Sequence, residues 1–232
     1  KNFKSLSFPT ISGSGPNGAI IHYKVNNKSN RTLRNGDLYL VDSGGQYNFG
    51  TTDVTRTVSL NNNQPRIKNI FTRVLKGHIA VASYKIKKNT SGSEIDIAAR
   101  KSLNKINLDY AHGTGHGVGY FLNVHEGPQG ISKGNKVKFK EGMVVSNEPG
   151  YYENGKFGIR IENLVTVKKA KNAYRFENLT LAPIDKTLIQ KELLNKKEID
   201  WLNKYHSTVY INLKKYMNKN ELKDLKNFCS NI

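Results

Sequence analysis

His112-Gly113-Thr114-Gly115-His116-Gly117-Val118-Gly119-Tyr120-Phe121-Leu122-Asn123-Val124-His125-Glu126-Gly127-Pro128 is the stretch from which the organisation of this chain can be worked out. It holds three of the six histidines of the chain, with glycines between them. Glycine has no Cβ, so a backbone rich in it can come close to a small, highly charged group. We therefore expect this stretch to fold around a site of chemistry.

Acidic residues on both sides of this stretch lie in similar surroundings. Upstream, Asp42 and Asp53 enclose a Gly- and Thr-rich run, and downstream, Glu148 precedes Pro-Gly and Glu162 lies two residues after an arginine. Asp42, Glu148 and Glu162 each have an ordinary interpretation alone, as a turn acid or a surface ion pair, and His116 could be a hydrogen-bonded structural histidine. Asp53 is more unusual, because it lies on the inward face of an expected strand with Thr55 and an unpaired buried acid is costly. We interpret the five together as converging on a pair of metal ions.

The ligand types favour divalent cations. Carboxylates with one imidazole suit Mn²⁺, Co²⁺, Zn²⁺ or Fe²⁺ better than a thiolate site would. Four carboxylates in one pocket repel each other, and two divalent ions balance their charge. Such an ion pair can lower the pKa of a bound water and polarise a carbonyl, as in the two-metal enzymes that include aminopeptidases.

Size and composition set the outer limits. The 232 residues, 37% of them hydrophobic, suffice for one sizeable core. No apolar run approaches the roughly 20 residues of a membrane span, and we expect no secretory signal. The single cysteine, Cys229, excludes an intramolecular disulfide framework and suits a reducing compartment. We expect a cytoplasmic protein, with an acidic digestive compartment as the alternative.

The formal charge of +19 has two interpretations. One is a polyanionic partner, either nucleic acid or an acidic membrane. The other is codon bias, because Lys, Asn, Ile and Tyr are all abundant and the lysines are scattered as short pairs. We favour solvated surface lysines and expect neither a nucleic-acid nor a membrane partner.

Apolar patterns predict the strands and helices. Strands are expected near residues 19–22, 38–42, 51–60, 143–146 and 158–165. The second and third form a hairpin connected through Asp42 to Asp53, with Asp53 and Thr55 on the face opposite Arg56. Helices are expected over residues 66–86, from an N-cap at Ser93, and within residues 185–228. The order of strands and helices predicts an α+β fold.

Several segments together resemble the catalytic domain of Xaa-Pro aminopeptidases (aminopeptidase P), within the pita-bread metallopeptidases. They are residues 7–12, 15–23, 41–44, 50–57, 75–80, 112–128, 148–152 and 158–163. The resemblance covers nearly the whole chain and is nearest to the large, three-domain cytosolic type. It implies a curved antiparallel sheet flanked by helices. One departure is Asn147, where relatives commonly carry Asp, and we expect only an indirect effect.

The resemblance also implies a domain organisation. Residues 1–180 would form a pita-bread metallopeptidase domain that lacks the N-terminal helices of the fold, and residues 181–232 a C-terminal helical extension packed on it. The chain also lacks a start methionine, and we expect it to be a piece of a longer polypeptide. The family commonly dimerises through this domain, so a homodimer is expected.

The resemblance assigns roles position by position. Asp42 would bind one ion, His116 and Glu148 would bind the other, and Asp53 and Glu162 would each bind both ions. The expected metal is Mn²⁺, with Zn²⁺ or Co²⁺ as alternatives. A hydroxide bridging the ions would attack the peptide carbonyl. The implied catalytic residues are His22, His112, His125 and Glu148, with His125 stabilising the oxyanion. The implied substrate-binding residues are His22, His112, Val124, His125, Tyr152 and Arg160.

The implied activity is release of the first residue from peptides that have a free N-terminus and proline second. Two alternatives remain. A prolidase-type dipeptidase, or a methionine aminopeptidase, would keep the fold and change the substrate. A catalytically inactive pita-bread module would bind nucleic acid or protein, although such relatives usually lose one or more of the five ligands.

Overall fold

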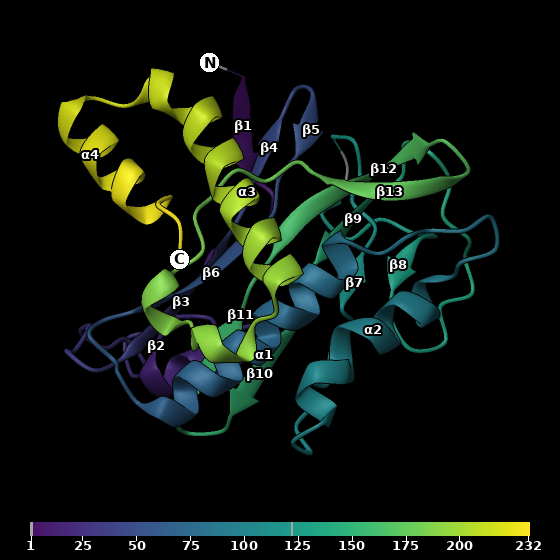
Figure 1. Ribbon diagram of the computed structural model, residues 1–232. Coiled ribbons are helices and arrows are strands. Elements are labelled where there is room, and N and C mark those ends of the chain that lie inside the picture. Colours follow the sequence, from purple (N-terminus) through teal and green to yellow (C-terminus); the bar gives the residue numbers. More distant parts are fainter. Residues whose placement is uncertain (1, 122) are drawn as a thin grey trace.

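The computed structural model describes residues 2–121 and 123–232 (Figure 1). The strands are β1 (Phe3–Leu6), β2 (Ile11–Ser14), β3 (Leu38–Ser43), β4 (Gly45–Tyr47), β5 (Gly50–Thr51), β6 (Val54–Ser59), β7 (Gly115–His116), β8 (Gly130–Ile131), β9 (Val144–Asn147), β10 (Gly150–Glu153), β11 (Phe157–Arg160), β12 (Asn163–Ala170) and β13 (Ala173–Asn178). The helices are α1 (Pro65–Ala82), α2 (Gly92–Asn104), α3 (Lys196–Leu213) and α4 (Lys219–Phe228), with short 3₁₀ helices η1 (Gly15–Ala19), η2 (Lys186–Leu188), η3 (Lys191–Leu193) and η4 (Lys214–Tyr216).

Antiparallel pairing organises the strands, as the α+β prediction requires. The sheets have the orders β2-β3-β6, β13-β12-β9, β10-β11, β7-β8 and β1-β4-β5. The predicted hairpin between residues 42 and 53 is confirmed, because β3 pairs with β6 and Asp42 lies opposite Thr55. Its connection is more than a loop, since β4 and β5 pair within it and β4 also pairs with β1.

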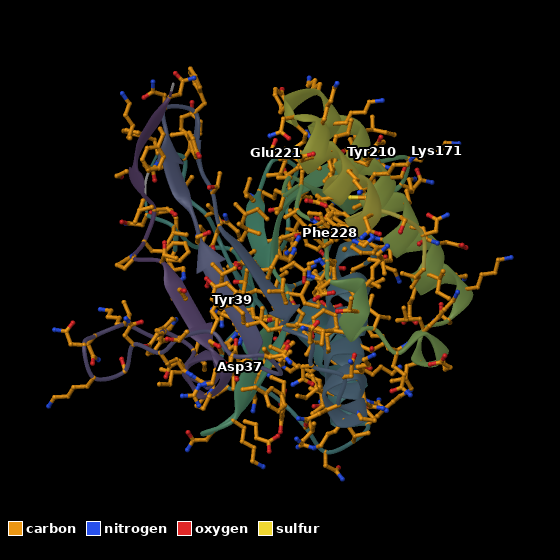
Figure 2. The ribbon with its side chains drawn as sticks, turned by 90° about the vertical axis from the view of Figure 1, so that its left-hand side faces the viewer. Asp37, Tyr39, Lys171, Tyr210, Glu221 and Phe228 are labelled. Atoms are coloured by element: carbon orange, nitrogen blue, oxygen red, sulfur yellow. The ribbon has the colours of Figure 1, made fainter. Side chains whose placement is uncertain are left out.

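The helices cover the strands and share their core. Residues of α1, such as Phe71 and Val74, are fully buried and belong to one apolar cluster with Ile159 of β11 and with Leu202 and Val209 of α3. Figure 1 shows α3 crossing the molecule beside α1, and Figure 2 shows the N-terminal strands and the C-terminal helices on opposite sides of the view. The C-terminal helices therefore help to build the main core.

The second helix begins two residues earlier than predicted. Ser91, not Ser93, is its N-cap, and Ser91 and Glu94 form a capping box in which Glu94 accepts from the Ser91 backbone at 3.0 Å. The spacing Ser-x-x-Glu is the usual sequence signal for this arrangement. The first helix ends at Ala82, earlier than expected, and Ile86 then pairs with Tyr174.

One predicted strand is wrong, and another is interrupted. Residues 19–22 form the end of η1 and a turn, closed by a hydrogen bond from Tyr23 N to Ile20 O at 3.1 Å. Residues 158–165 form two strands, β11 and β12, with a break at Ile161 and Glu162. At the break Glu162 N donates to Thr55 O at 3.1 Å. The chain thus changes partners where Glu162 lies.

Within residues 2–121 and 123–232, none of the helices has both the length and the apolar character needed to cross a membrane.

Candidate metal centre

Strand ends deliver the four acidic side chains. Asp42 lies in β3 and Asp53 directly before its partner β6, so their hairpin holds these two carboxylates side by side. Glu148 lies between β9 and β10, and Glu162 between β11 and β12. Because β9 pairs with the start of β12, with Asn147 opposite Asn163, the two glutamates are also fixed relative to each other.

A cavity of about 510 Å³ contains nearly all the residues singled out by the sequence. It is lined by His22, Asp42, Asp53, His112, His116, Val124, His125, Glu148, Arg160 and Glu162, together with apolar residues that include Phe8, Pro9, Ile11 and Ile21. Tyr152 is outside this lining, but its hydroxyl contacts two residues of the wall, His112 and Arg160.

His116 lies at the centre of the acidic group. Its Nε2 is 3.4 Å from Asp53 Oδ2 and 3.4 Å from Glu148 Oε1. Ligand atoms of Asp53, His116 and Glu162 all lie within 4.8 Å of one another. This spacing allows one cation to contact all three side chains.

Hydrogen bonds fix the ligands from behind. His116 Nδ1 lies 2.9 Å from Gly117 O, so Nδ1 donates to this carbonyl and Nε2 faces the carboxylates. Ser146 accepts from His116 N at 2.9 Å and donates to Glu148 Oε1 at 2.8 Å. Thr55 donates to Glu162 Oε2 at 2.7 Å.

Burial and mutual repulsion disfavour the charged forms of the clustered carboxylates. Burial first, and then the neighbouring Asp42 and Glu148, together raise the pKa of Asp53 to about 9. Burial, followed by Asp53 and Glu148, holds the pKa of Glu162 well above its usual value. The pKa of Glu148 is also raised, first by burial. Bringing cations to these carboxylates would restore their charged forms.

The side chains fit two divalent ions. Asp42 Oδ1 and Asp53 Oδ1 are buried and have no hydrogen-bond partner among the described residues. Buried carboxylate oxygens without a partner are costly unless a cation binds them. Four carboxylates and one correctly oriented imidazole nitrogen supply both the charge and the donor atoms that two such ions require.

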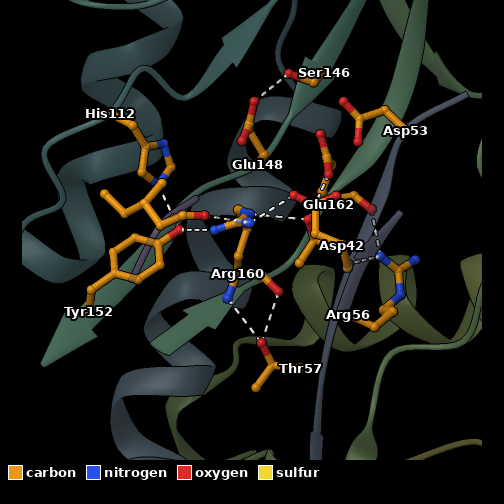
Figure 3. A network of polar contacts seen from close by, with 12 residues as sticks. Asp42, Asp53, Arg56, Thr57, His112, Ser146, Glu148, Tyr152, Arg160 and Glu162 are labelled. Atoms are coloured by element: carbon orange, nitrogen blue, oxygen red, sulfur yellow. Dashed lines mark hydrogen bonds and ion pairs between the residues drawn. The ribbon is translucent and has the colours of Figure 1, made fainter. Parts of the chain in front are cut away.

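Arg160 orders one wall of the site (Figure 3). Its buried guanidinium donates to Asp42 Oδ2 at 2.8 Å, to the Tyr152 hydroxyl at 2.6 Å and to Thr55 Oγ1 at 3.1 Å. It therefore occupies one oxygen of Asp42 and leaves the other, Oδ1, for a ligand in the cavity.

His112 and Tyr152 continue this network. Burial lowers the pKa of His112 to about 4 and raises that of Tyr152 to about 12, so both are neutral. His112 Nδ1 lies 2.7 Å from Gly113 O, and Nε2 lies 2.9 Å from the Tyr152 hydroxyl. With Nδ1 as donor, Nε2 accepts from the hydroxyl, which in turn accepts from Arg160.

His125 packs against His116, with ring centroids 4.0 Å apart. The pKa of His125 is lowered, mainly by burial and to a smaller extent by the neighbouring His116 and His22. His125 is therefore a neutral imidazole beside the ligand group. Val124 precedes it in the cavity wall, and His22 is exposed at the cavity.

Two contributors were not singled out from sequence. Thr55 contacts Glu162 and Arg160, and Ser146 contacts Glu148 and His116. Both lie two residues from a ligand on the same strand face, Thr55 from Asp53 and Ser146 from Glu148, so the two-residue period of a strand was the available signal.

Comparisons with known proteins place nearly the whole chain among the M24 metallopeptidases. The model of metallopeptidase family M24 matches residues 1–169, and the model of the C-terminal region of peptidase M24 matches residues 172–232. The chain is 52% identical over 218 residues to aminopeptidase P2 of Arabidopsis thaliana, covering 90% of this chain and 31% of that protein. It is 50% identical over 219 residues to a probable Xaa-Pro aminopeptidase P of Laccaria bicolor, covering 90% and 34%.

A solved structure shares the whole architecture. It is the X-prolyl aminopeptidase of Caenorhabditis elegans, described as a cytosolic enzyme with a di-nuclear active site, with a TM-score of 0.95 and 42% identity. The match covers 100% of this chain and 40% of that one, and it confirms the predicted pita-bread fold. The chain spans about a third of the length of the curated relatives it matches.

Proposed function

The chain belongs to metallopeptidase family M24, and from that premise we propose that it is the catalytic part of a metal-dependent aminopeptidase. Its substrates would be peptides with a free N-terminus and proline in the second position, from which it releases the first residue. The observation that carries this proposal is the cavity in which Asp42, Asp53, His116, Glu148 and Glu162 meet. The similarity to relatives named for X-prolyl activity supports the choice of substrate.

The five ligands would hold two divalent ions. We propose Mn²⁺ as the metal, with Zn²⁺ or Co²⁺ as alternatives. Asp42 would hold one ion, His116 and Glu148 the other, and Asp53 and Glu162 both. When bound, such a pair lowers the pKa of a water between the ions and polarises the scissile carbonyl. The surrounding side chains would bind the substrate, transfer the proton and stabilise the oxyanion.

The amine end of the substrate would lie beside Asp42. Arg160 holds Oδ2 of this carboxylate, which leaves the buried Oδ1 free. The leaving group is the proline nitrogen, which as a tertiary amide carries no hydrogen and needs a proton when the C–N bond breaks. Glu148, held by Ser146 at the cavity, would accept a proton from the attacking water and give it to this nitrogen.

The histidines would act on the other side of the carbonyl. His125 is neutral at pH 7 and can donate one ring N–H to the oxyanion, a contribution of about 3 to 4 kcal/mol for a well-placed donor. Both ring nitrogens of His112 are engaged by Gly113 and Tyr152. We therefore assign His112 to shaping the cleft, together with His22.

Apolar residues beside the acidic group favour a proline ring. Ile11, Ile21 and Val124 line the cavity that also holds the five ligands. The residue before proline is restricted to extended conformations, so a cavity that accepts this shape selects for it. Tyr152 would support this pocket from outside its lining, through its hydroxyl contacts with His112 and Arg160.

The assembly is proposed on the same basis. We propose residues 1–180 as the metallopeptidase domain and residues 181–232 as a helical extension packed on it, and Leu202 and Leu225 of the extension lie in the same core as α1. A homodimer in the cytoplasm is proposed from the resemblance to the cytosolic type of the family. We propose no nucleic-acid or membrane partner.

The test uses the full-length protein, stripped of metal and then supplied with Mn²⁺. Product release is followed by mass spectrometry for a tripeptide with proline second, the same tripeptide with alanine second, and an N-acetylated proline tripeptide. We expect cleavage of the free proline tripeptide alone, dependent on metal and abolished in Asp53→Asn. Cleavage restricted to an Xaa-Pro dipeptide would instead indicate a prolidase, and no metal binding would indicate an inactive module.

A further inference from the structure

Two buried basic side chains behind the metal centre have no part in the proposed reaction. They are Arg56 of β6 and His78 of α1, and neither lines the cavity. Both are buried, His78 completely. Both contact the backbone beside the proposed ligands Glu148 and Glu162.

His78 holds the backbone next to two ligands. Its Nδ1 lies 3.1 Å from Asn147 O and 3.2 Å from Ile161 O, the carbonyls directly before Glu148 and Glu162. One N–H shared by these carbonyls ties the two glutamate segments to α1. Asn147 returns a hydrogen bond from Nδ2 to His78 O at 2.9 Å, which an ionised aspartate at this position could not donate.

Arg56 holds the same region from β6. One guanidinium nitrogen, Nη1, donates to Glu162 O at 2.6 Å and to Thr55 O at 2.8 Å. The other, Nη2, donates to Asn163 Oδ1 at 2.7 Å, Ala182 O at 2.7 Å and the Tyr205 hydroxyl at 3.0 Å. The rigid guanidinium therefore links the backbone of Glu162 to the C-terminal part of the chain.

A single aromatic pair of α3 contacts both basic side chains. Trp201 and Tyr205 stack with centroids 5.4 Å apart and planes inclined by 4°. Trp201 meets the His78 ring edge-on at 5.9 Å, and the Tyr205 hydroxyl accepts from Arg56. Trp201 and Tyr205 lie in the region matched by the separate C-terminal family model.

We infer that the stacked Trp201–Tyr205 pair is a positioning element of the metal centre, acting through His78 and Arg56 on the segments that carry Glu148 and Glu162. The inference rests on the proposed metal centre. Groups that orient metal ligands typically change metal affinity by about 10- to 100-fold when they are removed. The C-terminal helices would thus contribute to metal binding as well as to the core.

The experiment compares Mn²⁺ affinity and the Co²⁺ absorption spectrum of full-length variants, with kcat and KM measured on the proline tripeptide. Tyr205→Phe removes only the hydroxyl that contacts Arg56. His78→Leu removes the shared N–H donor, and His78→Asn puts an amide N–H near the position of Nδ1. The matched control is Tyr210→Phe on the same helix (Figure 2), whose hydroxyl has no hydrogen bond in the described residues.

We expect Tyr205→Phe and His78→Leu to weaken Mn²⁺ binding by at least about tenfold and to change the Co²⁺ spectrum. We also expect kcat to fall with KM nearly unchanged, His78→Asn to recover much of the affinity, and Tyr210→Phe to match the wild type. Wild-type affinity and spectrum in a folded Tyr205→Phe protein would overturn the inference, even if His78→Leu fails to fold. Absence of metal binding in the wild type would instead overturn the proposed function.

Discussion

Asp53 combines burial, negative neighbours and an oxygen without a hydrogen-bond partner. Sequence alone marked it as unusual, because an acid on the inward face of a strand next to a threonine needs a partner. Its contacts with His116 and Glu162 could not be derived from sequence, since they depend on how three separate strand pairs meet. At this scale the residue types were predictable and their distances were not.

The metal-free protein should lose stability as pH rises. The pKa of Asp53 is about 9 in the folded state, against about 3.9 for an aspartate in an unfolded chain. From pH 4 to pH 9 the unfolded chain releases this proton while the folded one retains it, so the free energy of unfolding falls with rising pH. Asp53→Asn cannot ionise, and its melting temperature without metal should exceed that of the wild type by more at pH 8 than at pH 5. A constant difference would contradict this.

Tyr152→Phe should lower activity while leaving the fold intact. The change removes the hydroxyl that joins Arg160 to His112 and leaves the ring in place. Hydrogen bonds to charged groups contribute about 1.5 to 3 kcal/mol, which corresponds to a loss of roughly 10- to 100-fold in kcat/KM. Steady-state kinetics on the proline tripeptide measures this loss in kcat/KM. Unchanged kinetics would show that the network does not support the site.

Among the secondary-structure elements, β7 and β9 pass close to each other at the site. A Cβ on Gly115 would lie 1.9 Å from Ser146 O, so only glycine permits this crossing. The crossing places His116 beside Glu148, and the glycine-rich stretch predicted such a close approach. The break between β11 and β12 was not predicted, because residues 158–165 alternate evenly and the cause is hydrogen bonding to Pro149 and Thr55.

Gly115→Ala should therefore separate β7 from β9. We expect loss of Mn²⁺ binding of at least about tenfold together with a destabilisation above about 3 kcal/mol, the range of severe core changes. Titration of metal into the apo-protein and thermal unfolding measure the two effects. Gly50→Ala is the control, because a Cβ there meets nothing within 4 Å. Equal behaviour of the two variants would contradict the role given to the crossing.

At the scale of the whole molecule, the C-terminal part of the chain contacts the strand segments behind the candidate metal centre. Residues 182 and 205 reach Arg56, which also contacts the backbone of Glu162. The α+β class, the central hairpin and the C-terminal helices were predictable from apolar spacing. The contacts of the C-terminal helices with His78 and Arg56 were not, because aromatic residues at helical spacing indicate a core without identifying their partners.

Metal removal should lower the thermal stability of the whole protein. An ion at a free concentration 100 times its Kd stabilises a site by about 2.7 kcal/mol. For a chain of this size, 1 kcal/mol shifts Tm by about 2 to 4 °C, so adding Mn²⁺ should raise Tm by roughly 5 to 10 °C per site. Differential scanning calorimetry measures this, with Asp53→Asn as the comparison. An equal shift in the variant would place the binding elsewhere.

The number of metal ions bound per chain tests the central claim most directly. Full-length apo-protein is titrated with Mn²⁺, and bound metal is counted after removal of the free ion. We predict two ions per chain in the wild type and a large loss of both in Asp53→Asn, because Asp53 would contact both ions. A wild-type protein that binds no metal, or a variant that still binds two ions with wild-type affinity, would contradict the account.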